Sequence, residues 1–150
     1  MKEATLPDEL TELLDGQDLE RKIGDTMLLV VVRGDGFPRV AMLSVGEIFA
    51  PSPREVRLAL WRGSNTTESL SDIGKATLVY YAPRTGLYVG LETRRAGESS
   101  GLALFTARPA WVRRDEVEYA EITSGVRYTL RDPAAVLPRW RRAIDAMREV

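Results

Sequence analysis

The chain has 150 residues, of which 44% are hydrophobic, and its 21 basic and 22 acidic residues give a net charge of −1. This length predicts a single domain over residues 1–150, and the balanced charge provides no general attraction to nucleic acid or anionic lipid. The sequence contains no cysteine and no histidine, which excludes disulfides, thiol chemistry, Ser-His-Asp catalysis and a histidine-ligated haem.

These absences also narrow the possible chemistry. A chain without histidine or cysteine has few groups for nucleophilic or proton-transfer catalysis near neutral pH, so an enzyme of this composition is expected to rely on a bound cofactor. No metal site is expected, because zinc would have only carboxylate ligands. The first ten residues lack the apolar segment of a signal peptide, and no apolar run is long enough to cross a bilayer. We therefore expect a cytoplasmic protein with no membrane or nucleic-acid partner.

Two short helices are predicted at the start of the chain. Residues 6–16 combine Pro7 in the first turn, three leucines on one face and Gly16 as a stop signal. Residues 18–24 predict a second short helix.

Three strands should follow. Residues 26–33 form an apolar run, which predicts a strand buried on both faces. The Asp-Gly pair at 35–36 predicts a hairpin turn, and residues 39–49 predict the returning strand, with a bulge or bend at Gly46. Alternating residues over 54–61 predict the third strand.

The middle of the chain continues this pattern. A helix over residues 66–73, ended by Gly74, should separate the third strand from a fourth at 75–81 and a fifth at 87–94. The polar, glycine-rich residues 95–101 predict a mobile loop.

The last third predicts mixed structure. Residues 102–114 form a sixth strand, in which Pro109 indicates an edge position or a bulge. Residues 115–123 predict a helix and residues 125–130 a short strand. A final helix should begin at Asp132-Pro133, break at Pro138 and restart over 139–150.

These elements predict a mainly β fold. About six strands, joined mostly by short turns and decorated by helices at the ends and between the third and fourth strands, favour a small antiparallel barrel.

The segment at residues 62–68 has two interpretations. In the structural one, Asn65 caps a helix and Glu68 completes a capping box. In the functional one, Gly63 allows close backbone approach and the helix N-terminus favours a phosphate. Further donors would then come from Arg62, Ser64, Thr66 and Thr67.

A family resemblance supports the functional interpretation. The segment LALWRGSNTTESLSDIGKATLVYY at residues 58–81 resembles the central part of the pyridoxamine 5'-phosphate oxidase-like, FMN-binding split-barrel family, with Leu70 at the position of a buried helix leucine. LLVVVRGDGFPRVAMLS at residues 28–44 is similar to the opening hairpin of that family. The likeness extends over about residues 24–112.

The resemblance implies an antiparallel split β-barrel of about six strands with flanking short helices, which binds FMN as a homodimer with both sites at the interface. It implies that backbone groups of one strand line the flavin ring, namely those of Ala41, Met42, Leu43 and Ser44. It assigns the ribityl chain and phosphate to Leu60, Trp61, Arg62, Ser64, Asn65, Thr66 and Thr67. Tyr88 lies at a position from which, in the family, the partner chain contributes to the FMN site.

This sequence departs from the family at several basic positions. The family's oxidases carry Arg and Lys at the positions of Asn65 and Thr66 and a Lys near Ser44, and their substrate-binding arginine and histidine near the C-terminus have no counterpart. Weaker FMN binding is therefore expected, and oxidation of pyridoxamine phosphate is not. The expected function is FMN-dependent oxidoreduction of a small molecule, without identified catalytic residues. The alternatives are an F420-dependent reductase of the same fold, a non-catalytic flavin- or ligand-binding dimer, and a dimeric barrel without cofactor.

Overall fold

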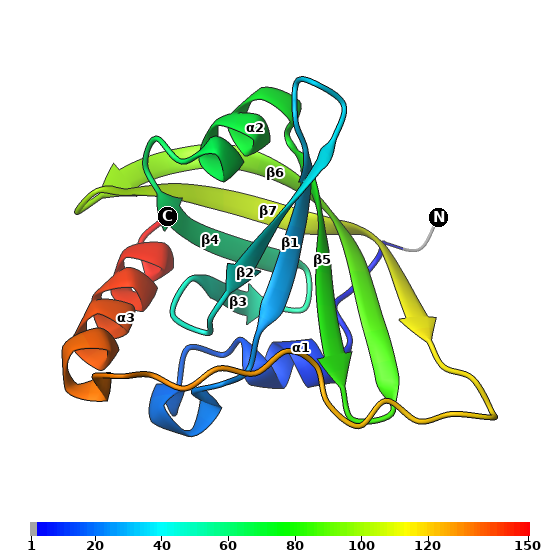
Figure 1. The fold of residues 1–150 in the computed structure, drawn as a ribbon. Coiled ribbons are helices and arrows are strands. Elements are labelled where there is room, and N and C mark those ends of the chain that lie inside the picture. The colour runs from blue at the N-terminus through cyan, green and yellow to red at the C-terminus, as the bar shows by residue number, and fades with distance from the viewer. Residues whose placement is uncertain (1–2) are drawn as a thin grey trace.

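Seven antiparallel strands form one curved sheet in the order β2-β1-β5-β6-β7-β4-β3 (Figure 1). The computed structural model describes residues 3–150. The strands are β1 (Met27–Val32), β2 (Pro38–Leu43), β3 (Ile48–Ser52), β4 (Glu55–Trp61), β5 (Lys75–Ala82), β6 (Thr85–Ser99) and β7 (Leu102–Asp115). Because β2 and β3 are the two edge strands, the barrel is split rather than closed. The predicted mainly β, antiparallel class is confirmed.

Helices cover the open parts of this sheet. They are α1 (Asp8–Leu13), the 3₁₀ helix η1 (Leu19–Lys22), α2 (Asn65–Ile73) and α3 (Pro133–Arg148). Figure 1 shows α2 over one end of the sheet, α1 at the opposite end and α3 beside β3 and β4. The N-terminal helices and the helix between the third and fourth predicted strands are therefore confirmed.

The core lies on the inner face of the sheet. Along β1, Met27, Leu29 and Val31 are buried, whereas Leu28 and Val30 are half-buried. The prediction of a strand buried on both faces is wrong for the single chain, because no element among residues 3–150 covers the outer face of β1 completely.

The predicted strand over residues 39–49 is interrupted at the expected bend. β2 ends at Leu43 and β3 begins at Ile48, with a turn between them. A Cβ atom added to Gly46 would lie 2.1 Å from Cγ of Trp140, so the indole of α3 occupies the space of a side chain at this position. The turn at Gly46 therefore also seats α3 against the sheet.

The prediction of a mobile loop over residues 95–101 is wrong. These residues extend β6, which pairs with β7 as far as Ser99 opposite Leu102, and the turn is confined to Ser100 and Gly101. Polar residues can form strands when a neighbouring strand satisfies their backbone groups. A register shift opposite Pro109 confirms the predicted bulge.

The two elements predicted over residues 115–130 are also wrong. Residues 116–132 contain neither a helix nor a named strand, apart from an isolated bridge between Val117 and Ala120. Figure 1 shows this segment passing beneath the sheet and alongside α1 before it enters α3. Residues 116–121 are exposed, so a helix there would bury no apolar face and would have little to stabilise it.

The C-terminal helix begins as predicted but does not break. The carboxylate of Asp132 accepts a hydrogen bond from the Ala135 amide, and α3 continues through Pro138. A proline inside a helix costs about 3 kcal/mol. The buried face of α3 offsets that cost; it comprises Trp140, Ala143, Ile144 and Met147.

Candidate functional site

The start of α2 is held by a compact hydroxyl cluster. Ser64, not Asn65, is the N-cap: its Oγ accepts a hydrogen bond from the Thr67 amide at 3.1 Å. The predicted capping box is wrong because, with Ser64 as the cap, Thr67 occupies the third helical position and Glu68 lies one residue too far along. The Thr67 hydroxyl also donates to the carbonyl of Trp61 at 2.7 Å. Two of the three predicted hydroxyl donors therefore stabilise the helix start.

The third hydroxyl, that of Thr66, makes a contact outside this cluster. Nε of Arg39, on β2, donates to Oγ1 of Thr66 at 2.9 Å. Arg39 is partly buried and forms no ion pair with a carboxylate in the described part of the chain. The amides of Asn65 and Thr66 have no hydrogen-bond partner among residues 3–150. We call this group, comprising Arg39 and residues 64–67, the α2 cradle.

Sequence reasoning missed Arg39 because 27 residues separate it from Thr66. One signal was available: alternate residues of a strand share a face. Arg39 therefore lies on the same face of β2 as Ala41 and Leu43, the inner face that also carries the buried residues of β1.

The predicted ring-lining residues lie along β2 and just beyond it. Leu43 is buried and Ala41 half-buried on the inner face, while Met42 points outward and is 65% exposed. Because β2 is an edge strand, one side of its backbone is not paired with another strand. Ser44 follows at the end of β2 and is buried, with its hydroxyl 2.9 Å from Oε1 of Glu47.

The remaining predicted residues are distributed over other surfaces. Leu60 is buried in the core. Trp61 extends from the opposite face of β4, toward α3, and Arg62 forms an ion pair with Glu98 at 3.2 Å. Tyr88 lies on the outer face of β6, where its hydroxyl donates to Asp115 at 2.8 Å. These four side chains do not converge on the α2 cradle.

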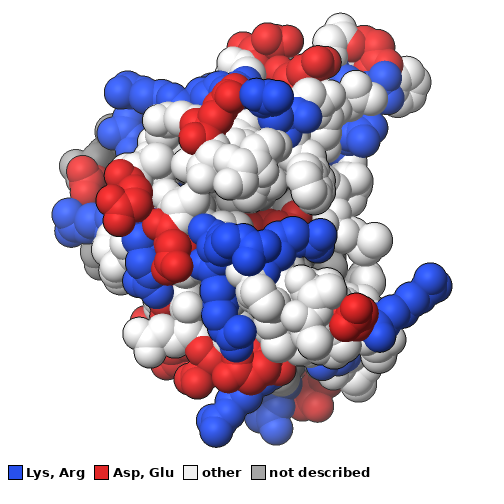
Figure 2. All heavy atoms as spheres, turned by 90° about the vertical axis from the view of Figure 1, so that its left-hand side faces the viewer, with Lys and Arg blue, Asp and Glu red and all other residues white. Residues whose placement is uncertain are grey.

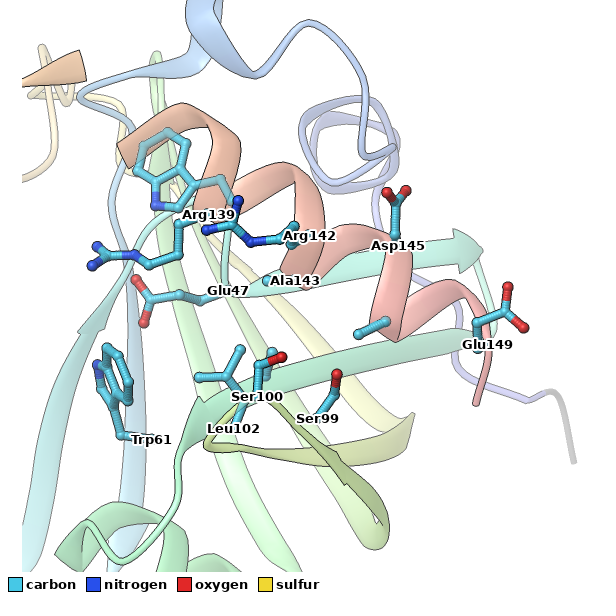
Figure 3. A pocket seen from close by; sticks show the side chains of 14 residues that line it. Glu47, Trp61, Ser99, Ser100, Leu102, Arg139, Arg142, Ala143, Asp145 and Glu149 are labelled. Carbon is cyan, nitrogen blue, oxygen red and sulfur yellow. The ribbon is translucent and has the colours of Figure 1, made fainter. Parts of the chain in front are cut away.

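A second hollow lies between α3 and the sheet, and we call it the α3 groove (Figure 3). It has a volume of about 550 Å³. One wall is α3; the facing surface consists of Trp61, Leu102 and the tip of the β6–β7 hairpin. Sequence reasoning missed this groove because its walls are brought together by packing between residues far apart in the chain, such as Gly46 and Trp140.

Glu47 occupies the inner end of the α3 groove, between Arg139 and Trp61 (Figure 3). Burial raises the pKa of the Glu47 carboxyl, and hydrogen bonds from Ser44 together with the charge of Arg139 oppose that rise. The Arg139 guanidinium lies 5.9 Å from the ring centre of Trp61. Glu47 therefore links Ser44, just beyond the end of β2, to the α3 groove.

Two further properties concern the described residues only. Within residues 3–150, no three acidic side chains gather closely enough to hold a metal ion. None of the four described helices is both long and apolar enough to cross a bilayer.

Comparison with known proteins places this geometry in context. No model of a known protein family matches the chain. The chain is 35% identical over 147 residues to YclD of Bacillus subtilis (strain 168), an uncharacterized protein, and the match covers 95% of this chain and 96% of YclD.

Solved structures share the fold at low sequence identity. A candidate pyridoxamine 5'-phosphate oxidase from Lactobacillus delbrueckii is 14% identical with a TM-score of 0.58, covering 75% of this chain and 97% of its own. An FMN-binding protein from Syntrophomonas wolfei is 13% identical with a TM-score of 0.55, covering 73% and 88%. An F420 reductase is 12% identical with a TM-score of 0.54, covering 72% and 98%. These neighbours confirm the predicted split-barrel fold. The chain belongs to the family of YclD and has the fold of the pyridoxamine 5'-phosphate oxidase-like proteins.

Proposed function

We propose that this protein binds FMN, with the phosphate in the α2 cradle, and acts as an oxidoreductase on a small molecule. The observation that carries the proposal is the contact between Arg39 and Thr66 at the start of α2. A guanidinium, two amides without partners in residues 3–150 and the positive end of a helix dipole all favour a phosphate at this point. Arg39 supplies the positive charge that positions 65 and 66 lack.

Each neighbouring residue has a defined task in this proposal. A bound flavin supplies the hydride and electron exchange that side chains alone cannot perform. The free edge of β2 offers backbone N–H and C=O groups to a polar ring edge. Ser44 and Glu47 place a hydroxyl and a carboxyl at the end of that strand, where they can hold or pass a proton.

We also propose that the protein is a homodimer formed through the outer face of the sheet. Val40 pairs with Val30 across β2 and β1, and Gly90 pairs with Trp111 across β6 and β7. Val40, Met42 and Trp111 are all about half exposed or more. An apolar face spanning several strands is typical of an interface.

The dimer assigns Tyr88 to the partner's site. Tyr88 lies on this outer face, whereas the α2 cradle opens from the inner face of β2, so the Tyr88 ring cannot reach the cradle of its own chain.

Light scattering tests the dimer and should give twice the 16.7 kDa chain mass, and Val40→Arg should shift the mass toward the monomer. A wild-type monomer at micromolar concentration would contradict the dimer.

The cofactor is tested by titrating the protein with FMN and with riboflavin, which lacks the phosphate. FMN should bind more tightly, and Arg39→Gln should remove most of that advantage while leaving riboflavin unaffected. Arg62→Gln is the matched control, because Arg62 also adjoins α2 but pairs with Glu98. It should leave both affinities within about twofold.

Equal affinities for FMN and riboflavin would refute the cradle. The absorption spectrum of the purified protein separates the remaining alternatives. A deazaflavin spectrum would favour F420 as the cofactor. This alternative is retained because an F420 reductase has the same fold. A bound flavin without turnover by NAD(P)H would favour a non-catalytic binding protein.

A further inference from the structure

The α3 groove has the size and lining of a small-molecule site. Its volume of about 550 Å³ lies within the range of known ligand pockets, roughly 300–1,000 Å³. The walls are mainly apolar, with Ala59 on β4, Ala143 and Ala146 on α3 and Leu102 on β7. The small alanine side chains on both walls leave room between α3 and the sheet for a ligand.

Two arginines of α3 are directed at this space. Arg139 and Arg142 lie one helical turn apart and side by side at the inner end of the groove (Figure 3). Neither forms an ion pair with a carboxylate in the part of the chain that the structure describes. Arg141, on another face of the same helix, is paired with Glu20 at 3.3 Å. Neighbouring like charges disfavour a helix, so an anion between Arg139 and Arg142 would stabilise the arrangement.

The charge of Glu47 does not cancel both arginines. Arg139 lies closest to Glu47 and over the ring of Trp61, so it balances the buried carboxyl. Arg142 remains available for a ligand. Figure 2, which faces the side of the molecule that carries α3, shows Lys and Arg side chains in a band across the middle beside uncharged surface.

The two ends of the groove differ in charge. Asp145 and Glu149 extend from α3 at the outer end, away from Arg139 and Arg142 (Figure 3). An anionic group is therefore favoured only at the inner end, beside Arg142. That end is also nearest to Ser44, the last of the predicted ring-lining residues.

We infer that the α3 groove is the substrate site and that it takes a planar organic acid, with the carboxylate at Arg142 and the conjugated body against Trp61. This inference rests on the proposed function, because a substrate must lie beside the cofactor ring. Carboxylate recognition by arginine is strong and directional, and aromatic faces stack on flat conjugated groups.

The three tryptophans of the chain provide an internal test. Trp61 and Trp140 line the groove, whereas Trp111 lies on the outer face of β7. Cinnamate, a planar acid, and cinnamamide, its neutral counterpart, are titrated into ¹⁵N-labelled protein while the three indole N–H resonances are followed. Cinnamate should shift Trp61 and Trp140 saturably without moving Trp111, and cinnamamide should bind about tenfold more weakly.

Two variants make the assignment specific to α3. Arg142→Gln should weaken cinnamate binding roughly three- to tenfold, while Arg141→Gln, on the same helix, should leave it unchanged. Ala146→Leu narrows the groove and should abolish binding of both probes.

The outcomes separate this inference from the cofactor proposal. The titration is made first on protein free of flavin, so a failure to bind FMN does not affect it. Equal affinity for the acid and the amide, or no effect of Arg142→Gln, overturns the organic-acid assignment. Absence of saturable shifts at Trp61 and Trp140 overturns the site itself, even if FMN binds in the α2 cradle.

Discussion

Replacing Gly46 by alanine should destabilise the protein through Trp140. The added Cβ would lie 2.1, 2.2 and 2.6 Å from Cγ, Cδ1 and Cδ2 of the indole, closer than carbon atoms can approach. Trp140 is only 5% exposed and sits on a helix held at both ends, so the ring cannot simply turn into solvent. Overpacking of this kind costs about 1–3 kcal/mol. No positive φ is involved at Gly46, so the whole effect should come from the collision.

Urea denaturation of the wild type and four variants measures this effect. Gly46→Ala should lower the free energy of unfolding by about 1–3 kcal/mol, whereas Gly34→Ala, where no atom lies within 4 Å of the new Cβ, should change it by less than about 1 kcal/mol. Trp140→Leu should itself be destabilising, but adding Gly46→Ala to it should cost little. An equal cost of Gly46→Ala with and without Trp140 would refute the reasoning.

Three further contacts can be tested by substitution: the cap of α2, the end of α3 and the Glu9–Arg114 ion pair. Ser64→Ala should cost about 1 kcal/mol of unfolding free energy and Asn65→Ala almost none, since Ser64 is the N-cap; thermal melting distinguishes them. Arg57→Met should lower the free energy of unfolding by about 1–3 kcal/mol, because the Arg57 guanidinium donates to the Met147 and Arg148 carbonyls at 2.9 and 3.1 Å. Faster hydrogen exchange at the end of α3 would locate the loss, and Arg54→Met, at an exposed position, is the control. Hydrogen bonds from Arg114 lower the pKa of Glu9 to about 2 from 4.5, so this pair stabilises the fold above pH 4.5 and is lost as the pH falls toward 2. Because both side chains are about one-third to one-half exposed, that loss should stay below about 1 kcal/mol, and Glu9→Gln should remove this part of the pH dependence.

Local patterns predicted the strands well because each strand has its own alternation and turn signals. The Asp-Gly pair at 35–36 lies in the turn between β1 and β2, and the turn between β5 and β6 falls between the strands predicted at 75–81 and 87–94, although it is shorter than predicted. The apolar run of β1 predicts two buried faces, yet its outer residues are covered only partly in the single chain. The proposed dimer would cover these outer residues, which explains why they are apolar.

Long-range packing explains what the sequence could not predict. Pro138 favours a helix break locally, but the buried side chains of α3 depend on a Gly46 almost one hundred residues away. The helix predicted over residues 115–123 has suitable residues but finds no apolar surface to cover. The cation at the α2 cradle comes from β2, so a reading of residues 62–68 alone could not identify it.

A crystal structure of the protein with FMN tests the cofactor proposal most directly. The phosphate should lie within hydrogen-bond distance of the Asn65 and Thr66 amides and of the Arg39 guanidinium, with the ring along the free edge of β2. A phosphate bound elsewhere, with Arg39 still directed only at Thr66, would contradict the proposed site.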